Sequence, residues 1–224
     1  MKEKIEIGGR HFTLIDLTHP LNESIPTWDG SEGFRLKEEE QIRLLTNSGT
    51  HIDAPSYFAE KKASVDQLPL SHLFVPACLI DVSSHAKGDT RIGREEIEAY
   101  EKEHGQIPEK SVVVFFTGWS RLWSVPEEYR NPDKSGTLRL PTLSLSAIEL
   151  LLQRDIAAVA IDTLALEPLD SDYSCHRMLM DEGIYIIENI ANAHRLPPKG
   201  AYLIALPLKI EGGVEAPARV IALI

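Results

Sequence analysis

The stretch NSGTHIDAPSY, residues 47–57, places a histidine and an aspartate two positions apart. In an extended strand, residues i and i+2 point to the same face, so His51 and Asp53 would present an imidazole and a carboxylate side by side. That pair suits a divalent metal such as Zn²⁺ or Mn²⁺. Gly49 permits a tight bend, and Pro55 prevents the strand from extending its ladder of hydrogen bonds. The segment therefore predicts a short strand whose tip can bind a metal.

The composition is that of a chain able to build one full hydrophobic core. It has 224 residues, 43% of them hydrophobic, and a formal net charge of −11. A charge of this sign disfavours nucleic acid and anionic membranes as partners, since both need a basic face, and it favours cations. We find no apolar run near the ~20 residues that cross a bilayer. We also find no signal peptide, so the expected compartment is the cytoplasm.

The two cysteines, Cys78 and Cys175, are isolated in the sequence. Neither belongs to a Cys-x-x-Cys pair, so we expect no thiolate zinc site and no disulfide framework. Cys78 lies in an apolar run and is expected to be a buried thiol. Cys175 adjoins His176, and packing inside a helix is favoured there over a nucleophilic role.

Hairpin and strand–helix–strand patterns both occur, which predicts a single α/β domain over residues 1–224 with a mixed β-sheet and flanking helices. Two alternating runs flank Gly8-Gly9 and predict a β-hairpin. The polar segment 120–140 is long enough to predict a lid or a binding loop. Residues 36–45 are ambiguous between helix and strand. Further strands are expected at 78–82, 112–116, 156–161, 184–187, 202–210 and 219–224, and helices at 94–104, about 144–154 and 172–182.

A histidine and a glutamate from the C-terminal half can complete the candidate site. His176 lies in the predicted helix 172–182, and Glu188 ends the apolar strand that follows Gly183. A helix, a glycine turn and a short strand can bring two such residues back to one place. Glu188 follows an apolar run and needs either solvent or a partner. For His176 the alternative is a position on the helix surface.

These features resemble the family of metal-dependent cyclases and hydrolases that includes bacterial kynurenine formamidase. The family motif His-x-Gly-Thr-His-x-Asp-x-Pro-x-His is recognisable in residues 48–55, and a Pro-x-Trp-x-Gly segment in residues 26–30. Residues 183–189 also fall in family order, and the resemblance extends over most of the chain. It implies a swivelling β/β/α-like fold and a homodimer or higher homo-oligomer.

The resemblance implies two metal positions that share ligands. The first takes His51, Asp53 and Glu188, together with a histidine that Asn47 replaces in this chain. The second takes Asp53, His176 and Glu188, all of which are present. An amide oxygen is a weaker ligand than an imidazole and a poor one for Zn²⁺. We therefore expect Zn or Mn, with one tightly held metal, or one strong and one weak, rather than two equal sites.

The resemblance also implies that Tyr57 replaces the histidine that moves the proton. A phenol, with an ordinary pKa of about 10, is a poor general base near neutral pH. It can still donate a hydrogen bond to an oxyanion, and the alternative is packing beside Phe58. Trp28 is expected to form one wall of the binding site for a planar substrate, or else to pack in the core. Asp162 is expected to orient a metal ligand or to cap a strand end.

The resulting hypothesis is metal-assisted hydrolysis of an amide, formamide, lactone or other cyclic carbonyl compound, acting on C–N bonds other than peptide bonds. A bound metal would polarise the carbonyl and lower the pKa of its water to about 7. The alternative is a catalytically degenerate relative that binds a small molecule without turning it over. In both cases the partner is a small molecule rather than nucleic acid or a membrane.

Overall fold

The structure, a computed structural model, describes residues 3–36, 41–168 and 170–224. Its helices are α1 (Arg94–His104), α2 (Pro126–Arg130), α3 (Leu145–Leu152) and α4 (Ser174–Asp181). Its strands are β1 (Glu3–Ile7), β2 (Arg10–Asp16), β3 (Phe34–Leu36), β4 (Ile42–Leu44), β5 (His51–Asp53), β6 (Phe74–Asp81), β7 (Arg91–Ile92), β8 (Val112–Phe116), β9 (Thr142–Leu143), β10 (Ala158–Ile161), β11 (Tyr185–Glu188), β12 (Ala201–Pro207) and β13 (Glu215–Leu223). Short 3₁₀ helices span Pro55–Tyr57, Val65–Gln67, Leu70–His72, Trp119–Leu122 and Ala193–Arg195. Within the described ranges, no helix is long and apolar enough to cross a membrane.

The main sheet closes on itself at β5. This strand lies between β11 and β13 and pairs antiparallel with both. From β13 the order continues through β12, β6, β8 and β10 to β11, and β2 and β1 extend the sheet from the other half of β13. The pairs β6–β8, β8–β10 and β10–β11 are parallel, whereas those of β12 and β13 are antiparallel. The predicted mixed sheet in one α/β domain is therefore confirmed.

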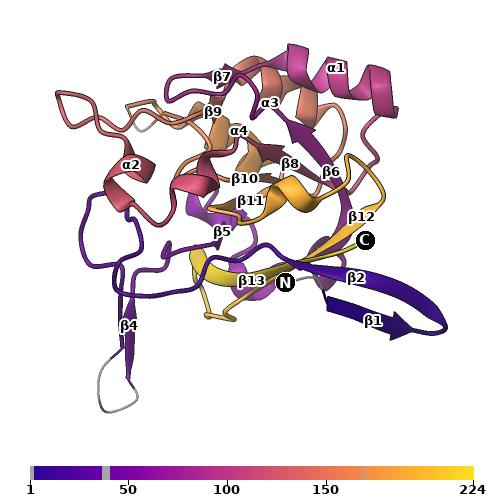
Figure 1. Cartoon of the computed structure of the whole chain (residues 1–224), viewed down its shortest axis with the longest axis horizontal. Coiled ribbons are helices and arrows are strands. Elements are labelled where there is room, and N and C mark those ends of the chain that lie inside the picture. The colour runs from indigo at the N-terminus through magenta and orange to yellow at the C-terminus, as the bar shows by residue number, and fades with distance from the viewer. Residues whose placement is uncertain (1–2, 37–40, 169) are drawn as a thin grey trace.

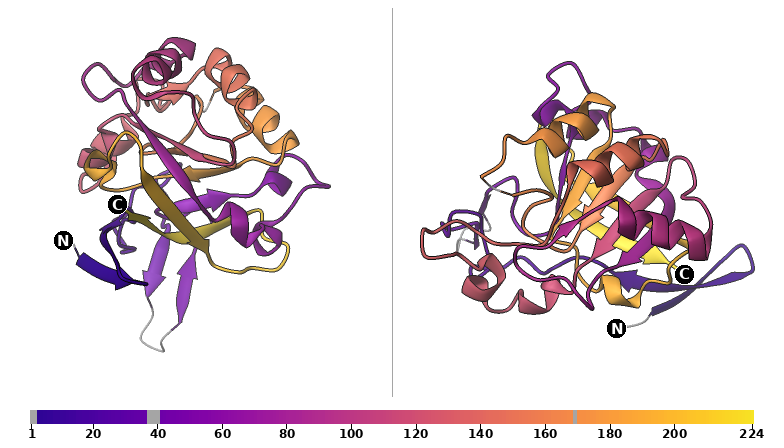
Figure 2. Two further views of the ribbon diagram at one scale, coloured as in Figure 1. Left: turned by 90° about the vertical axis from the view of Figure 1, so that its right-hand side faces the viewer. Right: turned by 90° about the horizontal axis from the view of Figure 1, so that it is seen from above.

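Two hydrophobic clusters fill the two sides of the parallel strands. Val114 points into the interior cluster, where it joins Leu203 of β12, and its neighbour Phe115 points to the outer cluster, where it joins Leu151 of α3. This alternation follows from the two-residue period of a strand buried on both faces. Figure 1 and Figure 2 show α1, α3 and α4 gathered on one side of the sheet. The layers are therefore helices, parallel strands and antiparallel strands.

Local sequence signals account for two elements that form where they were predicted. Gly8 and Gly9 have φ angles of 57° and 77°, which the tight turn between β1 and β2 requires. Helix α1 covers the predicted residues 94–104. The Glu96 carboxylate accepts a hydrogen bond from a backbone N–H at the start of this helix, and Gly105, with φ 89°, ends it.

Several predicted bounds change in the structure. Segment 36–45 contributes to strands β3 and β4, which project as a hairpin (Figure 1), so its helical alternative is wrong; residues 37–40 lie outside the described residues. Strand β12 ends at Pro207, before the predicted position 210. The last strand begins at Glu215, four residues before the predicted 219. A proline such as Pro217 argues against a strand when only the sequence is considered. In the structure, Pro217 lies in β13 and pairs opposite β5 where the sheet closes.

Both cysteines are free and buried, as predicted. Cys175 packs in the outer hydrophobic cluster with α4. Burial raises its pKa to about 12, so the thiol is protonated at neutral pH. A nucleophilic role for Cys175 needs a thiolate, and its environment therefore supports the packing interpretation.

The buried histidine His19 makes the stability of the fold depend on pH. Its ring stacks on Trp123 with a centroid distance of 3.9 Å, and burial lowers its pKa from 6.5 to about 4. Between these pH values the unfolded chain binds a proton at His19 that the folded chain does not, so stability falls as the pH drops from 6.5 to about 4. The full loss is about 3 kcal/mol of unfolding free energy.

We expect His19→Gln to flatten this part of the stability–pH curve in urea unfolding measured at several pH values. His11→Gln is the matched control, because His11 is largely exposed on β2. An unchanged slope in the His19 variant would show that another group causes the acid sensitivity.

Candidate metal centre

Strand β5 delivers the predicted pair to the closure of the sheet. Its residues His51, Ile52 and Asp53 are all buried, and Ile52 points into the interior hydrophobic cluster while its two neighbours point to the opposite face. On the adjoining strands, Glu188 of β11 lies opposite His51, and Glu215 of β13 lies opposite Asp53. The strand register therefore brings three carboxylates around one imidazole.

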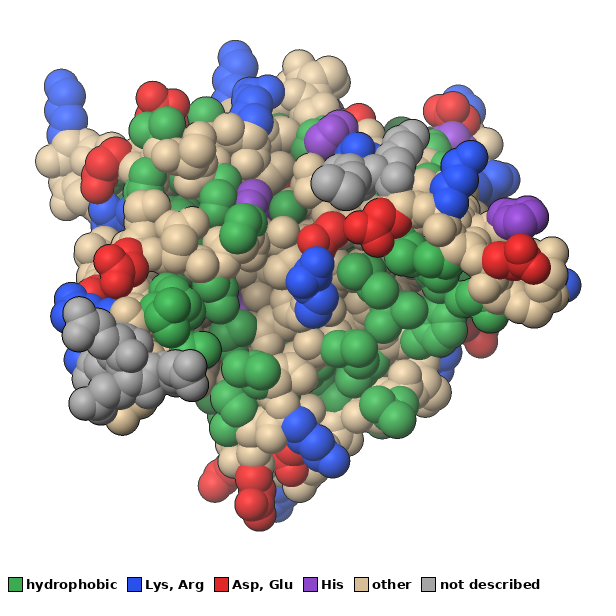
Figure 3. Space-filling view, turned by 60° about the horizontal axis from the view of Figure 1, so that its bottom comes forward, with side chains coloured by type: hydrophobic (Ala, Val, Ile, Leu, Met, Phe, Trp, Pro, Cys, Tyr) green, Lys and Arg blue, Asp and Glu red, His purple; other side chains and the backbone are tan. Residues whose placement is uncertain are grey.

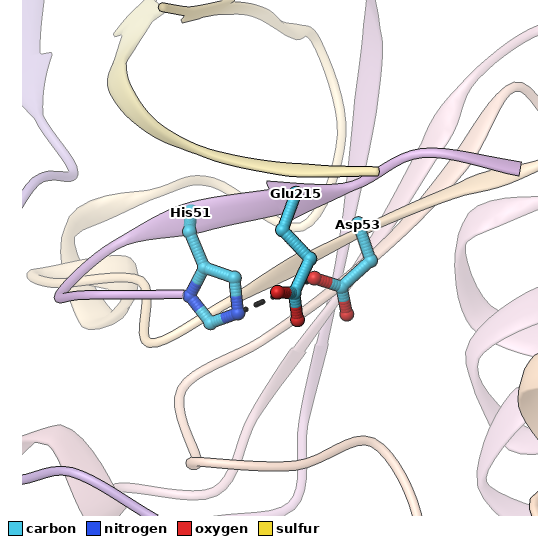
Figure 4. Close-up of side chains that lie close together, drawn as sticks. All are labelled: His51, Asp53 and Glu215. Carbon is cyan, nitrogen blue, oxygen red and sulfur yellow. Dashed lines mark ion pairs between the residues drawn. The ribbon is translucent and has the colours of Figure 1, made fainter. Parts of the chain in front are cut away.

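The ligand atoms form two overlapping groups. His51 Nε2 lies 3.3 Å from Asp53 Oδ1 and 3.6 Å from Glu188 Oε2, and His176 Nε2 of α4 lies 3.7 Å from Glu188 Oε1. One group consists of His51, Asp53 and Glu215, the other of Asp53, His176 and Glu188, and within each group the ligand atoms lie within 4.8 Å of one another. Figure 4 shows the first group converging from β5 and β13. The structure thus brings together His51, Asp53, His176 and Glu188, and the surface alternative for His176 is wrong because this side chain is buried.

The donor set fits a divalent cation. Asp53 Oδ1 is buried and has no hydrogen-bond donor among the described residues. The cluster to which it belongs has four carboxylates and two imidazoles, and no lysine or arginine of the described chain forms an ion pair with any of the carboxylates, namely Asp53, Glu167, Glu188 and Glu215. Even with both imidazoles charged, the cluster keeps an excess of negative charge. Buried charge of this kind is stable only when paired, and a metal is the usual partner of mixed imidazole and carboxylate donors.

Hydrogen bonds at Nδ1 orient both imidazoles. The backbone carbonyl of Gly49 accepts a hydrogen bond of 2.9 Å from His51 Nδ1, and the Glu167 carboxylate accepts one of 2.5 Å from His176 Nδ1. Each contact places a proton on Nδ1 and turns Nε2 toward the carboxylate cluster. This is the usual way in which proteins prepare a histidine for a metal.

Gly49 and Asn189 hold the turn that carries β5. Gly49 has a φ of 66°, and a Cβ at this position would approach the Leu21 side chain to 2.6 Å, so only glycine fits. The Asn189 side-chain amide donates to the Gly49 carbonyl at 3.0 Å, and the backbone carbonyl of Asn189 accepts from Thr50 Oγ1 at 2.6 Å. These bonds connect the start of β5 to the end of β11. They keep His51 and Glu188 in register.

The buried charges shift the pKa values of the cluster. Burial disfavours the charged imidazoles, but the Asp53 carboxylate outweighs it at His51 and hydrogen bonding to Glu167 and Glu188 outweighs it at His176. The pKa values rise to about 9 and about 10, respectively. Burial, followed by the charge of Asp53, raises the pKa of Glu188 and of Glu215. The cluster therefore holds protons that a metal must displace, and metal binding is coupled to proton release.

The cluster forms the floor of a pocket that opens to solvent and has a cavity volume of about 50 Å³. Asn47, Trp28 and Tyr57 all line it. Trp28 is 39% exposed, so the alternative of core packing is wrong for this residue. Tyr57 is 42% exposed, and its ring also contacts Phe58 at a centroid distance of 4.8 Å, so it packs and faces the pocket at the same time.

Two expectations about neighbouring residues change. The Asp162 carboxylate accepts hydrogen bonds from Thr117 and Ser120 in the turn after β8, so it caps a strand end and orients no metal ligand. No residue of segment 120–140 lines the pocket. This segment packs instead around Tyr129, which is fully buried, and it therefore forms no lid over this site.

The sequence reasoning missed Glu167 and Glu215. Glu167 follows the apolar residues 164–166, where a charge needs a partner, and that signal was available. Glu215 precedes Ala216-Pro217, and because proline is unfavourable in a strand, the start of β13 was not predicted there. Both carboxylates are buried and both line the pocket.

Comparison with known proteins agrees with this geometry. Residues 15–168 match the family model described as "Putative cyclase". The chain belongs to this cyclase family. An isatin hydrolase from Roseibium aggregatum is 33% identical over 192 residues, which cover 81% of this chain and 73% of that protein. A kynurenine formamidase from Salinibacter ruber is 30% identical over 223 residues, which cover 93% and 96%.

A solved structure described as a potential metal-dependent hydrolase with cyclase activity superposes with a TM-score of 0.77 at 27% identity, covering 95% of this chain and 98% of that one. The cyclase-family fold therefore extends over nearly all of the chain. The resemblance deduced from the motif around His51 and Asp53 is confirmed.

Proposed function

We propose that this cyclase-family protein is a metal-dependent hydrolase that cleaves a C–N bond, other than a peptide bond, in a small amide, formamide or cyclic carbonyl compound. Relatives named isatin hydrolase and kynurenine formamidase support this class of reaction. The observation on which the proposal depends is Asp53 Oδ1, buried and without a donor in the described chain, at the point where the two ligand groups meet. A lactone is a further substrate of the same carbonyl chemistry.

The proposed metal is Zn²⁺ or Mn²⁺, held most tightly by Asp53, His176 and Glu188. His176 supports this choice because Glu167 orients its ring. Asn47, which lines the same pocket, offers only a neutral amide oxygen to the group around His51. When bound, the metal supplies a Lewis acid that polarises the substrate carbonyl and activates water.

Protein side chains would bind and orient the substrate above this floor. Trp28 stands at the pocket wall and can cover the face of a planar ring. Burial and the carboxylates of Glu215 and Asp53 raise the pKa of Tyr57 to about 12, so its phenol stays protonated at neutral pH. Tyr57 is therefore proposed to donate a hydrogen bond to the oxygen that gains charge during hydrolysis, rather than to act as a base.

Tyr57→Phe tests this role. We expect kcat to fall about 10- to 100-fold, less than for a fully enclosed donor, because the phenol is partly open to solvent. The shape of the pH–rate profile near neutral pH should stay the same, because the phenol does not titrate there. Tyr202→Phe, on an exposed tyrosine of β12, is the control. Loss of a near-neutral pKa from the profile of Tyr57→Phe would identify the phenol as a base instead.

A substrate panel tests the proposed function directly. Purified protein would be assayed with isatin, an N-formyl aromatic amine, a cyclic imide and a lactone, each with Zn²⁺, with Mn²⁺ and after treatment with chelator. We expect turnover of at least one C–N substrate, restored by metal after chelation. If no compound is hydrolysed in any metal state while one of them still raises the melting temperature, the protein is a small-molecule-binding relative.

The compartment proposed for this reaction is the cytoplasm. Two free, buried cysteines suit a reducing environment, where thiols do not need to be paired. Thiol titration of the protein from freshly lysed cells should find both cysteines reduced.

We further propose a homodimer or a higher homo-oligomer. Large hydrophobic side chains are exposed on the β3–β4 hairpin and on and after β12, namely Leu36, Ile42, Tyr202, Leu206 and Leu208. Figure 3 shows hydrophobic side chains gathered on the face that carries this hairpin. Exposed apolar patches of this kind mark interaction sites in soluble proteins.

Sedimentation velocity should therefore give a species of at least twice the 25.0 kDa chain mass. Leu206→Lys should shift the distribution toward the monomer, whereas Val125→Lys, at an exposed residue preceding α2, should not. A wild-type protein that sediments as a monomer at all concentrations would contradict the proposal.

A further inference from the structure

Glu215 is the one member of the carboxylate cluster whose role nothing above assigns. It begins β13 and lies directly opposite Asp53 of β5 in the antiparallel register. Residues opposite each other in such a pair project to the same face, with Cβ atoms about 5 Å apart. Figure 4 shows Glu215, Asp53 and His51 pointing into one space. Glu215 is only 9% exposed, so its carboxylate has little contact with water.

The contacts of Glu215 leave its charge largely uncompensated. Its Oε2 accepts a hydrogen bond of 2.9 Å from Thr46 Oγ1, and across the described ranges no lysine or arginine pairs with it. Like charges opposite each other on two strands destabilise a sheet. In the buried Glu215–Asp53 pair this repulsion is relieved by a proton or by a cation between the two carboxylates. His51 supplies one imidazole, but its Nε2 already faces both Asp53 and Glu188.

A second observation points to the same place. Asp53 Oδ1 has no hydrogen-bond donor in the described chain, although it is buried. It belongs to the group of His51, Asp53 and Glu215, whose ligand atoms lie within 4.8 Å of one another, the spacing at which one cation can contact all three. A buried carboxylate oxygen that accepts no hydrogen bond, a facing carboxylate and an imidazole whose Nε2 points at that oxygen form three sides of a coordination shell.

We propose that Glu215 is a metal ligand, which with His51 and Asp53 forms a second cation position that prefers Mn²⁺ to Zn²⁺. This inference rests on the proposed function, because it assumes that the neighbouring position of Asp53, His176 and Glu188 is a metal site. Two carboxylates and one imidazole make an oxygen-rich donor set, and such sets suit Mn²⁺, whereas Zn²⁺ favours more nitrogen or sulfur. Glu215 thus provides the charge that the neutral Asn47 amide in the same pocket does not.

The test is metal binding by the full chain, independent of any substrate. The protein would be freed of metal with chelator and then titrated calorimetrically with Mn²⁺ and with Zn²⁺, and the bound metal counted by elemental analysis. We expect the wild type to bind two Mn²⁺ per chain. Glu215→Gln should keep one and bind the second at least 100-fold more weakly. Glu211→Gln, at an exposed position of the loop before β13, is the matched control and should behave as wild type.

The melting temperature separates a ligand from a merely structural residue. Glu215→Gln keeps the side-chain shape but removes one of two like charges, so the metal-free variant should melt no lower than the metal-free wild type. Its gain in melting temperature on adding Mn²⁺ should be smaller. A structural partner of Thr46 would show the reverse: lower metal-free stability with unchanged metal binding.

A double variant tests the assignment from the opposite direction. Asn47→His combined with Glu215→Ala moves an imidazole into the pocket and removes the carboxylate. This variant should bind Zn²⁺ at this position about 10-fold or more tightly than Glu215→Ala alone, while its Mn²⁺ preference is lost. Equal Zn²⁺ affinity in the two variants would count against the proposed position of Glu215.

The metal counts and the hydrolysis assay together distinguish failure of this inference from failure of the proposed function. Two Mn²⁺ bound by wild type and by Glu215→Gln alike would overturn the inference, and if Glu215→Gln then also lost kcat, the carboxylate would be a proton acceptor. A single Mn²⁺ in both proteins, with hydrolysis intact, would also overturn it and leave the proposed function standing. Two Mn²⁺ in wild type and one in Glu215→Gln would uphold it even if the substrate panel failed. No metal in wild type would overturn both.

Discussion

Asp53→Ala is expected to remove metal binding from both ligand groups and to lower kcat/KM by at least about 10³-fold. Asp53 is the residue that the two groups share, and its buried Oδ1 accepts no hydrogen bond from the described chain. A loss of this size corresponds to at least about 4 kcal/mol of transition-state stabilisation. Elemental analysis after dialysis should find less than one metal per chain in the variant.

The control is Asp89→Ala, which removes an exposed aspartate far from the pocket in sequence and should retain metal and activity. Asp53→Ala should stay folded, because it relieves the repulsion among Asp53, Glu188 and Glu215 in the metal-free protein. Circular dichroism and thermal melting without metal check this. A folded Asp53→Ala protein that keeps a full complement of metal would contradict the proposed centre.

Glu167→Ala should lower the metal affinity of the position formed by Asp53, His176 and Glu188 about 10- to 100-fold, although Glu167 is not itself a proposed ligand. The carboxylate accepts hydrogen bonds from His176 Nδ1 at 2.5 Å and from the His176 backbone N–H at 2.9 Å. Without it, the imidazole loses both its fixed orientation and the partner that keeps its proton on Nδ1. Competition titration against a metal-binding dye would measure the loss.

The same substitution should also lower the free energy of unfolding by about 1–2 kcal/mol, since Glu167 accepts hydrogen bonds at the start of α4. Glu167→Gln separates the two effects. It retains an acceptor oxygen and should recover most of the stability but only part of the metal affinity. Glu182→Ala, at the exposed end of α4, is the control. Equal metal affinity in Glu167→Ala and wild type would mean that packing alone orients His176.

The local part of the fold could be predicted because its causes lie within a few residues. Helix α1 ends before Gly105, whose positive φ angle does not continue a helix, and β8 follows from five consecutive apolar residues, 112–116. The strand period alone put His51 and Asp53 on one face. The segment 36–45 could not be assigned, because its apolar residues fit both periods and only the pairing of β3 with β4 distinguishes them.

Four of the six side chains of the candidate centre were anticipated in the same way, whereas Glu167 and Glu215 were not. His176 and Glu188 are delivered by a helix, a glycine turn and a strand, whose geometry is nearly local. Glu167 lies in a loop after β10, and its contact with His176 depends on where α4 packs. The lid expected from segment 120–140 does not form for a related reason, since Tyr129 is buried in one cluster with Leu164 and Ala165 of the pocket lining, to which the segment itself contributes no residue.

By itself, the sequence determined the short strand with its histidine and aspartate, the distant histidine and glutamate, and the class of fold that presents them. These depend on backbone periodicity, turn residues and capping, which act between near neighbours. Only the tertiary structure decided that Glu215, from the last strand, stands opposite Asp53. That placement depends on the register with which a sheet closes on itself, and register is set by packing of the whole core rather than by the residues that happen to meet there.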